Sequence, residues 1–588
     1  MIYKKDNVTK LLNNNFVKYG SKISVESCSS NSVGYEELLR IINSFIAKIA
    51  NYGLKRGDKI VLIFKNKATM LPILISVFYR NVAIPANPQY TDKEFYEFVK
   101  DVKPRFIIFG EEIKGISKIA KTLNIAAICI GSNFMIIKKI GIKNLCMNRK
   151  NVCNFNNFSK KNQTALILPT SGTAGRPKLA LLTHYNIIFS IKKIIEALEL
   201  KENDGFLNIM PMCHIHSIML SLASLMVGSR VIVGDNANSE TFYNCTNKFK
   251  VSWYSASPTI HKAILDKYVK NKNKIKLRFV RSSAAPMPLA LAKKIEEKMK
   301  VPLIESYGMT EAGLQITSNP LPPALRILGS VGKPVGTKVK IIDKSDKFVK
   351  KGKIGEIVIS GDNVIKNYLN KKKSSKYFYK KKWLRTGDLG YFDKSGFLYI
   401  KGRIKELINS GGIKIFPREI DESLMNHPKI YQAVTFSIPH ETLGEEVGAA
   451  VILKKNKKAT EKEIKTYLLK KNAVYKVPKK IFFIDKIPGR STGKLQRIGL
   501  YDIFKKQINV KVIDSRLNHT QRVILDIWRN VLNNKSIGIN DNFFEIGGDS
   551  LKLAEVSVKL GKNGNKLDVK TILNYPTIRE LSKVIKIN

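Results

Sequence analysis

Cysteine is scarce in this chain of 588 residues, and the cysteines that occur are not paired in the sequence. The six are scattered without any Cys-x-x-Cys spacing, at Cys28, Cys129, Cys146, Cys153, Cys213 and Cys245. This pattern implies neither a disulfide framework nor a zinc site, and it fits a reducing compartment.

Long hydrophobic runs are also missing. The polar N-terminus, Met1 to Asp6, lacks the apolar segment of a signal peptide. The most apolar early run, 70–78, is far shorter than the roughly 20 residues that span a bilayer, and it indicates a buried helix. The final Ile587-Asn588 matches no peroxisomal or retention signal. We therefore expect a cytoplasmic protein without a membrane span.

Acidic residues are few compared with basic ones. The chain has 47 Asp and Glu against 102 Lys and Arg, which gives a net charge of +55 at pH 7. Such an excess can indicate nucleic-acid or anionic-membrane binding. The lysines are spread over the whole chain, however, and Asn and Ile are abundant too, as AT-rich codons would produce. We interpret the charge as a composition bias and expect no specific nucleic-acid partner, while a basic nucleic-acid-binding protein remains a remote alternative.

The first half of the chain alternates between two hydrophobic patterns. Short apolar runs predict strands at 59–65, 105–110, 164–169, 230–234, 277–281 and 302–306. Amphipathic or apolar segments between them predict helices at 68–80, 91–101, 184–198 and 216–227. Alternation of this kind favours a largely parallel α/β sheet.

The second half of the chain has a different pattern of predicted strands and helices. Segments 338–343, 355–360 and 397–401 predict a smaller β region. After it come strands at 431–438, 447–453 and 480–484 with helices at 417–426 and 460–471, and finally helices at 518–532, 550–560 and 576–586. We therefore expect four parts: a large α/β domain (1–402), a small mobile α+β subdomain (403–505), a linker (506–517) and an all-α helical bundle (518–588).

The strongest motif of the large domain, Pro-Thr-Ser-Gly-Thr-Ala-Gly-Arg-Pro-Lys at 169–178, follows the predicted strand 164–169. Its glycines allow the backbone to approach phosphate, its hydroxyls and amides donate to phosphate oxygens, and Lys178 adds positive charge. No Gly-Lys-Ser/Thr closes it, so it is not a Walker A loop. A polar turn after a strand is the alternative reading of the loop alone.

This loop resembles the signature of adenylate-forming enzymes, which include acyl-CoA synthetases, peptide-synthetase adenylation domains and luciferases. Ala174 and Leu179 depart from that signature. The resemblance implies ATP and Mg²⁺ as cofactors. It also implies phosphate contacts from Thr170, Ser171, Gly172, Thr173, Gly175 and Lys178.

Four further motifs follow in the order of that family. In Glu-Ser-Tyr-Gly-Met-Thr-Glu at 305–311, the resemblance implies that Tyr307 packs on adenine, Thr310 binds phosphate and Glu311 holds Mg²⁺. The other three are Arg-Thr-Gly-Asp at 385–388, Gly-Arg-Ile-Lys-Glu at 402–406 and Pro-Gly-Arg-Ser-Thr-Gly-Lys at 488–494. In them the resemblance implies a ribose contact from Asp388, a nucleotide contact from Arg403, a hinge at Lys405 and a catalytic lysine at Lys494. It also implies a thiol tunnel beside Gly411 and Gly412, in the Ser-Gly-Gly segment at 410–412.

A third kind of motif, Gly-Gly-Asp-Ser-Leu-Lys at 547–552, lies near the C-terminus. It resembles the attachment site of carrier proteins, in which the serine, here Ser550, receives 4′-phosphopantetheine from coenzyme A. An ordinary helix N-cap is the alternative role for Ser550. A carrier implies a phosphopantetheinyl transferase as a partner.

The substrate is less well defined by the sequence. Residues 211–217 lack the aspartate that amino-acid-activating relatives use for the α-ammonium, and a buried ammonium without a counter-charge is costly. His214, His216, Arg281 and Ser282 are candidates for the acyl pocket. A buried histidine satisfied by backbone is the alternative role for each of the two, and the alternatives for Arg281 are a second substrate carboxylate and a structural ion pair. Residues 317–322 and 329–336 resemble those of oxalyl-CoA synthetases, so small polar or dicarboxylic acids are favoured.

Together these motifs predict an adenylate-forming ligase that activates a carboxylic acid as acyl-AMP and loads the arm on its own Ser550. Such a module would hand its acyl group to downstream synthase or tailoring enzymes of polyketide or nonribosomal peptide type. The alternative is an acyl-CoA ligase, for oxalate or another small acid, that transfers to free CoA.

Overall fold

The computed structural model describes most of the chain. The described residues are 7–28, 32–141, 159–170, 178–268, 275–369, 377–380, 382–440, 442–487, 497–504, 517–532, 534, 537–544, 546, 548, 550–561 and 569–585. They fall into two compact units, Met1–Thr435 with Pro439–Gln496 and Phe436–Ile438 with Arg497–Asn588. Within these ranges no helix is both long enough and apolar enough to cross a bilayer.

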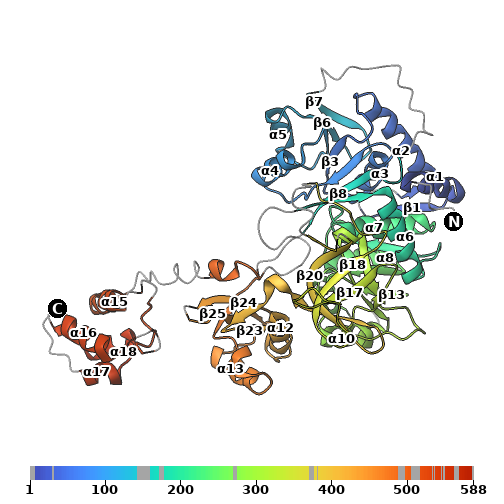
Figure 1. Cartoon of the computed structure of the whole chain (residues 1–588). Coiled ribbons are helices and arrows are strands. Elements are labelled where there is room, and N and C mark those ends of the chain that lie inside the picture. The colour runs from blue at the N-terminus through green and yellow to red at the C-terminus, as the bar shows by residue number, and fades with distance from the viewer. Residues whose placement is uncertain are drawn as a thin grey trace. The chain divides into compact units, whose positions relative to one another are not determined.

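The first sheet has seven strands in the order β7-β6-β5-β3-β4-β8-β9 (Figure 1). Its strands are β3 (Lys59–Ile63), β4 (Val82–Pro85), β5 (Phe106–Gly110), β6 (Ala126–Ile130), β7 (Ile136–Ile140), β8 (Thr164–Pro169) and β9 (Leu179–Thr183). Alternate residues of β3 belong to different cores: Ile60 and Leu62 to one, Val61 and Ile63 to another. Both faces are covered, which explains why this strand is an unbroken apolar run. The covering helices are α3 (Lys67–Phe78), α4 (Asp92–Val102) and α5 (Ile116–Thr122).

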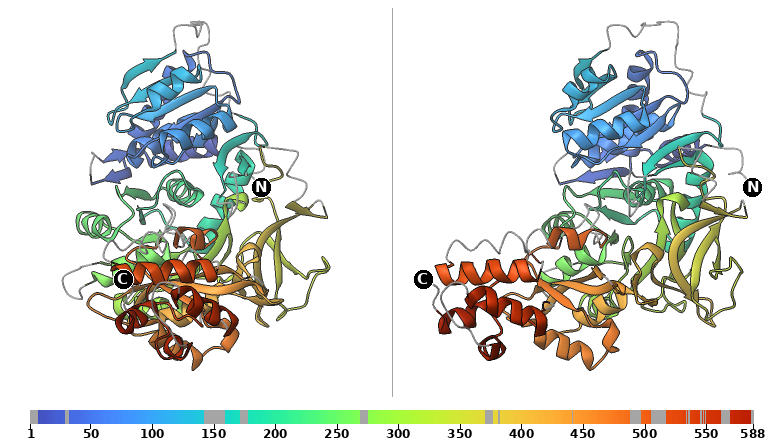
Figure 2. Two further views of the ribbon diagram at one scale, coloured as in Figure 1. Left: turned by 90° about the vertical axis from the view of Figure 1, so that its left-hand side faces the viewer. Right: turned by 60° about the vertical axis from the view of Figure 1, so that its left-hand side comes forward.

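The second sheet has nine strands in the order β16-β15-β14-β13-β12-β10-β11-β1-β2. The strands are β1 (Ile23–Ser27), β2 (Val33–Gly34), β10 (Gly205–Asn208), β11 (Arg230–Val233), β12 (Trp253–Ala256), β13 (Phe279–Ser282), β14 (Leu303–Met309), β15 (Leu314–Ser318) and β16 (Lys333–Pro334). Pairing from β1 to β14 is parallel, and the outer pairs β1–β2, β14–β15 and β15–β16 are antiparallel. The chain thus builds two mainly parallel sheets where the alternation alone predicted one; in Figure 2 most strands of the first are blue and most strands of the second are green.

Seven helices accompany this second sheet within the described ranges. They are α1 (Val8–Tyr19), α2 (Tyr35–Ala50), α6 (His184–Leu198), α7 (Ile215–Met226), α8 (Ser239–Lys248), α9 (Pro258–Asp266) and α10 (Leu289–Met299). Helix α6 begins with a capping box in which Thr183 and Asn186 satisfy each other's backbone N–H groups. Helix α7 is buried at every position from Ile215 to Leu225, as expected of a helix enclosed by other elements.

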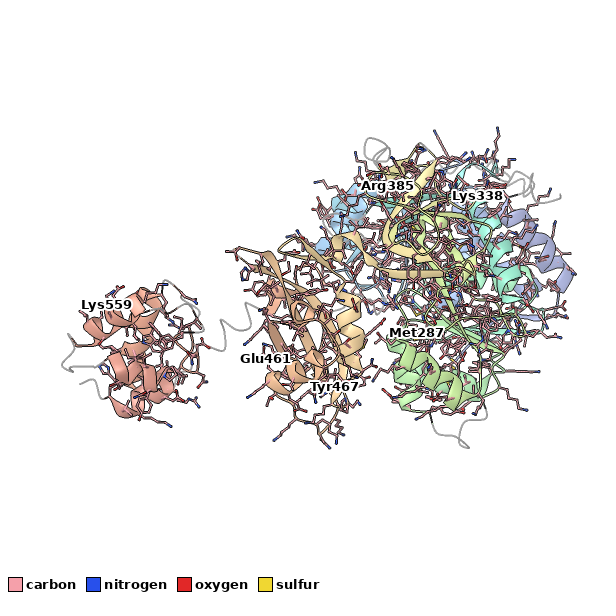
Figure 3. The ribbon with its side chains drawn as sticks, turned by 60° about the horizontal axis from the view of Figure 1, so that its bottom comes forward. Met287, Lys338, Arg385, Glu461, Tyr467 and Lys559 are labelled. Carbon is pink, nitrogen blue, oxygen red and sulfur yellow. The ribbon has the colours of Figure 1, made fainter. Side chains whose placement is uncertain are left out.

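Two smaller sheets complete the first part of the chain. One contains β17 (Lys338–Ile342), β18 (Gly355–Ser360), β19 (Phe378–Tyr379), β20 (Trp383–Phe392) and β21 (Leu398–Arg403), all antiparallel. The other contains β22 (Ile408–Ser410), β23 (Ile413–Ile415), β24 (Ile430–His440), β25 (Gly444–Leu453) and β26 (Lys480–Phe483), with helices α12 (Pro417–Met425) and α13 (Glu461–Leu469). Glu461 and Tyr467, labelled in Figure 3, both lie on α13.

In the residues of the C-terminal unit that the structure describes, the last four helices are α15 (His519–Val531), α16 (Ser550–Gly561), α17 (Val569–Asn574) and α18 (Ile578–Val584). Trp528, Phe543 and Val556 are buried in its core. The predicted fold class, a large α/β domain followed by a small α+β domain and a helical bundle, is confirmed. The sequence did not predict α17, and the last helix begins at Ile578, after the N-cap Thr577, rather than at residue 576.

Candidate active site and carrier serine

The two ends of the predicted phosphate loop are held together by a hairpin. Strands β8 and β9 pair antiparallel up to Pro169 and Leu179, and the Thr170 amide donates to the Lys178 carbonyl oxygen at 2.7 Å. Thr170 is buried. The fold therefore fixes where the loop leaves and rejoins the sheet. The predicted contacts Ser171, Gly172, Thr173 and Gly175 lie outside the described residues.

A buried carboxylate lies near the Lys178 end of this loop. Glu311 is in the 3₁₀ turn η2 (Thr310–Ala312) that follows β14, and it accepts a hydrogen bond from Tyr368 Oη at 3.0 Å. The Lys178 ammonium lies over the rings of Tyr377 and Tyr368, 3.7 and 4.9 Å from their centroids. Burial raises the pKa of Glu311, and the nearby positive charge of Lys178 opposes that rise.

These residues fit the predicted Mg²⁺ ion. The described residues contain no group of three or more His, Cys, Asp or Glu side chains that could enclose a metal. Mg²⁺ commonly uses only one or two carboxylates and takes its other ligands from substrate phosphates and water. A single carboxylate, Glu311, beside a predicted phosphate loop therefore suits that cation.

A chain of three polar side chains links the second sheet to the third. Tyr307 Oη on β14 donates to Asp388 Oδ2 on β20 at 2.6 Å, and Arg403 Nε on β21 lies 2.9 Å from Asp388 Oδ1. Asp388 is buried, and its charge raises the pKa of Arg403. All three were predicted as nucleotide contacts, and the fold brings Tyr307 to a carboxylate that lies 81 positions further along the chain.

Gly308 and Arg385, which lie close in sequence to Tyr307 and Asp388, have structural roles. The bulge in the β14–β15 hairpin after Tyr307 leaves no space at Gly308, where a Cβ would lie 1.5 Å from the Leu314 carbonyl oxygen. Arg385 of β20, labelled in Figure 3, pairs with Glu356 at 2.8 Å and with Asp346 at 3.0 Å. The motif arginine thus fixes β20, which carries Asp388, against its neighbours.

The predicted hinge and tunnel residues lie at exposed turns. Lys405 is exposed in the 3₁₀ turn η4 (Ile404–Glu406), directly after β21. Gly411 and Gly412 form the turn between β22 and β23, with φ values of 57° and 88° that favour glycine. Lys494 lies outside the described residues. The hinge, the tunnel and the catalytic lysine remain predictions.

The two candidate histidines begin α7. His214 is the N-cap residue and is half-buried, whereas His216 is 5% exposed in the first turn. The next residue, Ser217, donates to Asn208 Oδ1 at 2.6 Å and to the Met210 carbonyl oxygen at 2.8 Å. The start of α7 is therefore fixed to the loop that follows β10.

Arg281 is fully buried on β13, and its neighbours differ from those expected of an ion pair. Its guanidinium donates to Ser255 Oγ at 3.1 Å and to Gln315 Oε1 at 3.3 Å, and among the described residues it has no acidic partner. Burial lowers its pKa to about 9. Arg281 Nε, Gln315 Nε2 and Ser282 Oγ are buried donors that have no hydrogen-bond partner within the described ranges. Sequence reasoning missed Ser255 and Gln315, although Gln315 is a polar residue in β15, a strand that is buried at every position.

In the C-terminal unit, Ser550 is the first residue of α16. The loop before it is fixed to the start of α18, because the Phe543 amide donates to the Pro576 carbonyl oxygen at 2.8 Å. The Gly548 amide donates back to the Phe543 carbonyl oxygen at 2.9 Å, and a Cβ at Gly548 would lie 2.3 Å from the Phe543 ring. One glycine of the motif is thus required by packing.

This fold and its constellation of polar residues define an adenylate-forming ligase joined to a phosphopantetheine carrier. The chain belongs to the AMP-binding enzyme family, which it matches over residues 13–369. It also matches the AMP-binding enzyme C-terminal domain over 419–494 and the phosphopantetheine attachment site over 522–585. The predicted membership and enzyme class are confirmed.

Known proteins resemble the chain over most of its length. It is 33% identical to an oxalate–CoA ligase of Saccharomyces cerevisiae, over 85% of this chain and 97% of that protein. It is also 33% identical to an oxalate–CoA ligase of Arabidopsis thaliana, over 84% of this chain and 97% of that one. O-succinylbenzoate coenzyme A synthetase of Bacillus subtilis, solved in complex with ATP and magnesium ion, matches with a TM-score of 0.73 and 25% identity, over 85% of this chain and 100% of that one.

Proposed function

We propose that this chain activates a carboxylic acid with ATP as an acyl-AMP and passes the acyl group to a phosphopantetheine thiol carried on its own Ser550. The observation that carries the proposal is the presence of an adenylate-forming domain and a phosphopantetheine attachment domain in one chain. A tethered acceptor has a high effective concentration, which favours transfer within the chain over transfer to a free thiol.

In the first half-reaction, a substrate carboxylate oxygen attacks the α-phosphorus of ATP and pyrophosphate leaves. Asp388 would accept hydrogen bonds from the ribose hydroxyls, and Tyr307 would pack on adenine. Thr170, Lys178 and Thr310 would donate to phosphate oxygens, and Glu311 would hold Mg²⁺, which neutralises phosphate charge when bound. Lys494 would stabilise the charge that develops between the carboxylate and the α-phosphate.

In the second half-reaction, the small domain would turn about Lys405 and present the strand edge at Gly411 and Gly412 to the incoming thiol. The phosphopantetheine group supplies that thiol when attached. The comparisons support an acceptor in the chain itself. The match to the yeast oxalate–CoA ligase includes 97% of that protein but only 85% of this chain, so this chain has a part that the relative lacks.

We further propose a small polar or dicarboxylic acid as the substrate. Arg281 supports this, because a buried guanidinium without an acidic neighbour among the described residues suits a substrate carboxylate. His214 and His216 would donate to the same acyl group. The names of two relatives, oxalate–CoA ligases, agree with a substrate of this class. An acyl-CoA ligase that uses free CoA is the second candidate, because the comparisons are with CoA ligases.

Intact-protein mass tests the proposal. The chain is treated with CoA and a broad-specificity phosphopantetheinyl transferase, and then with Mg-ATP and a pool of carboxylic acids. We expect a phosphopantetheine increment that Ser550→Ala abolishes, followed by a second increment whose mass identifies the acid. An arm that stays unacylated while free acyl-CoA accumulates would favour the CoA ligase. Failure of Ser550 to take up the arm would contradict the carrier role.

A further inference from the structure

Two cysteines that are far apart in the sequence lie side by side in the fold. The sulfur atoms of Cys28 and Cys245 are 3.4 Å apart, although 217 positions separate the two residues. Cys28 directly follows β1, and Cys245 lies on α8. The fold brings them together because β1 pairs parallel with β11, the strand that precedes α8, with Ser27 opposite Val233.

The two thiols differ in their access to solvent. Cys28 is half-buried at the margin of the core beneath α8, whereas Cys245 is fully buried within that core. A small oxidant can therefore reach Cys28 first, and a group formed on Cys28 remains within reach of Cys245. Sulfur atoms in a disulfide are about 2.0 Å apart, so closure from 3.4 Å requires the two sulfur atoms to approach each other by only about 1.4 Å.

A buried cation lies beside the pair. The Lys67 ammonium, on the first turn of α3, donates to the carbonyl oxygens of Ile209 at 2.9 Å and Gly234 at 2.6 Å. Burial raises the pKa of Cys245, the neighbouring Cys28 and Asp235 add to that rise, and the positive charge of Lys67 opposes it. The closeness of the two sulfur atoms, rather than a stabilised thiolate, therefore favours the reaction.

We propose that Cys28 and Cys245 form a modification site, a thiol pair that hydrogen peroxide or another small peroxide oxidises to a reversible disulfide. The Cys28 sulfur attacks one peroxide oxygen, the O–O bond breaks, and Cys28 becomes a sulfenic acid while water or an alcohol leaves. The Cys245 sulfur then attacks the Cys28 sulfur, the S–O bond breaks, and the Cys245 proton leaves with hydroxide as water. Two thiols lose two electrons in total, and the peroxide gains them.

The bond would join the end of β1 to α8 beside the loops that follow β10 and β11. Lys67 holds both loops, and the loop after β10 continues through Cys213 into the candidate histidines of α7. Oxidation would therefore restrain the side of the second sheet from which the proposed acyl pocket is built. The disulfide itself does not depend on the proposed function.

The test is made on the full-length chain with hydrogen peroxide near stoichiometry. After oxidation the protein is denatured, alkylated and digested, and cross-linked peptides are identified by mass. We expect one peptide pair that contains Cys28 and Cys245, two fewer alkylated thiols than in the reduced chain, and recovery of both by dithiothreitol. Because the cross-link is read on the unsubstituted chain, the result does not depend on whether a variant folds.

Single Cys→Ser variants test which cysteines form the cross-link. Cys28→Ser and Cys245→Ser should each abolish the cross-link, whereas Cys129→Ser, a change at a buried cysteine on β6, should leave it intact. The intact chain should also show a higher midpoint of thermal unfolding when oxidised, because the disulfide closes a long loop. A cross-link between any other cysteines, or peroxide treatment that leaves Cys245 fully alkylated, would overturn the proposal.

Discussion

The Tyr307 hydroxyl donates a hydrogen bond to Asp388 at 2.6 Å, and this contact joins β14 of the nine-stranded sheet to β20 of an antiparallel sheet. The first residue is the proposed adenine platform and the second is the proposed ribose acceptor. A single hydrogen bond thus sets the position of one nucleotide contact relative to the other. Arg403 adds a charge on the opposite oxygen of the same carboxylate.

Asp388→Asn should lower ATP–pyrophosphate exchange by about ten- to a hundredfold, since hydrogen bonds to a charged group contribute roughly 1.5–3 kcal/mol. Tyr307→Phe keeps the aromatic ring and loses only the donor, so its loss should be below about tenfold. Tyr391→Phe serves as a control on the same strand, because that ring stacks on Tyr399. Equal activity of Asp388→Asn and the unsubstituted chain would remove Asp388 from the site.

Glu305 should make stability fall as pH rises. It is 4% exposed on β14, and burial raises its pKa from 4.5 to about 7, although the Gly329 amide donates to it at 2.6 Å. Because the pKa is raised in the folded state, the stabilising contribution is complete below about pH 4.5 and is lost as the pH rises through about 7. The resulting loss of unfolding free energy is at most about 3 kcal/mol.

The check is chemical unfolding at several pH values. Relative to Glu305→Gln, the unsubstituted chain should lose unfolding free energy between about pH 5 and pH 8. Glu297→Gln, a change at an exposed position of α10, should keep the pH dependence of the unsubstituted chain. If Glu305→Gln shows that same pH dependence, the buried carboxyl is not the cause.

Gly548→Ala should damage the carrier bundle and leave adenylation intact. The added Cβ would lie 2.3 Å from the Phe543 ring, and overpacking of this kind costs about 1–3 kcal/mol. We expect slower phosphopantetheine attachment and a lower unfolding midpoint of the C-terminal unit, with unchanged pyrophosphate exchange. Gly538→Ala, where the nearest atom would be 3.7 Å away, is the matched control. Normal attachment to Gly548→Ala would refute the packing role.

Arg281→Met should test the substrate class without emptying the core. Removing a buried cation that has no acidic partner among the described residues should cost little stability. If a substrate carboxylate pairs with the guanidinium, KM for the best dicarboxylic acid should rise about tenfold or more, while KM for ATP stays unchanged. Arg281→Lys keeps the charge, so its KM for the acid should lie between those of the unsubstituted chain and Arg281→Met. An unchanged KM for the acid in Arg281→Met would argue for a purely structural arginine.

Much of the fold could be predicted because its strands are short apolar runs between helical segments. The run at 164–169 and the helix at 184–198 were predicted with the bounds that the structure has. The six-residue α17 could not be, since it is shorter than two helical turns and has no recognisable period. The split into two sheets also escaped prediction, because alternation along the chain does not reveal which strands pair.

The candidate site was predictable where motifs carried it, as at Tyr307, Glu311 and Asp388. The Tyr368–Glu311 hydrogen bond spans 57 positions and belongs to no motif, so only the topology reveals it. Arg281 shows a second limit. The sequence left open a substrate carboxylate or an ion pair, and the structure instead gives neutral partners, Ser255 and Gln315, that come from other strands.

The shared carboxylate of Asp388 has a consequence for synthesis of the protein. The match to the AMP-binding family ends at residue 369, yet two of the three linked side chains, Asp388 and Arg403, come after it. A nascent chain would therefore complete both parallel sheets before it could complete the candidate nucleotide site. The candidate nucleotide site would therefore be complete on the ribosome only after residue 403 had left the exit tunnel.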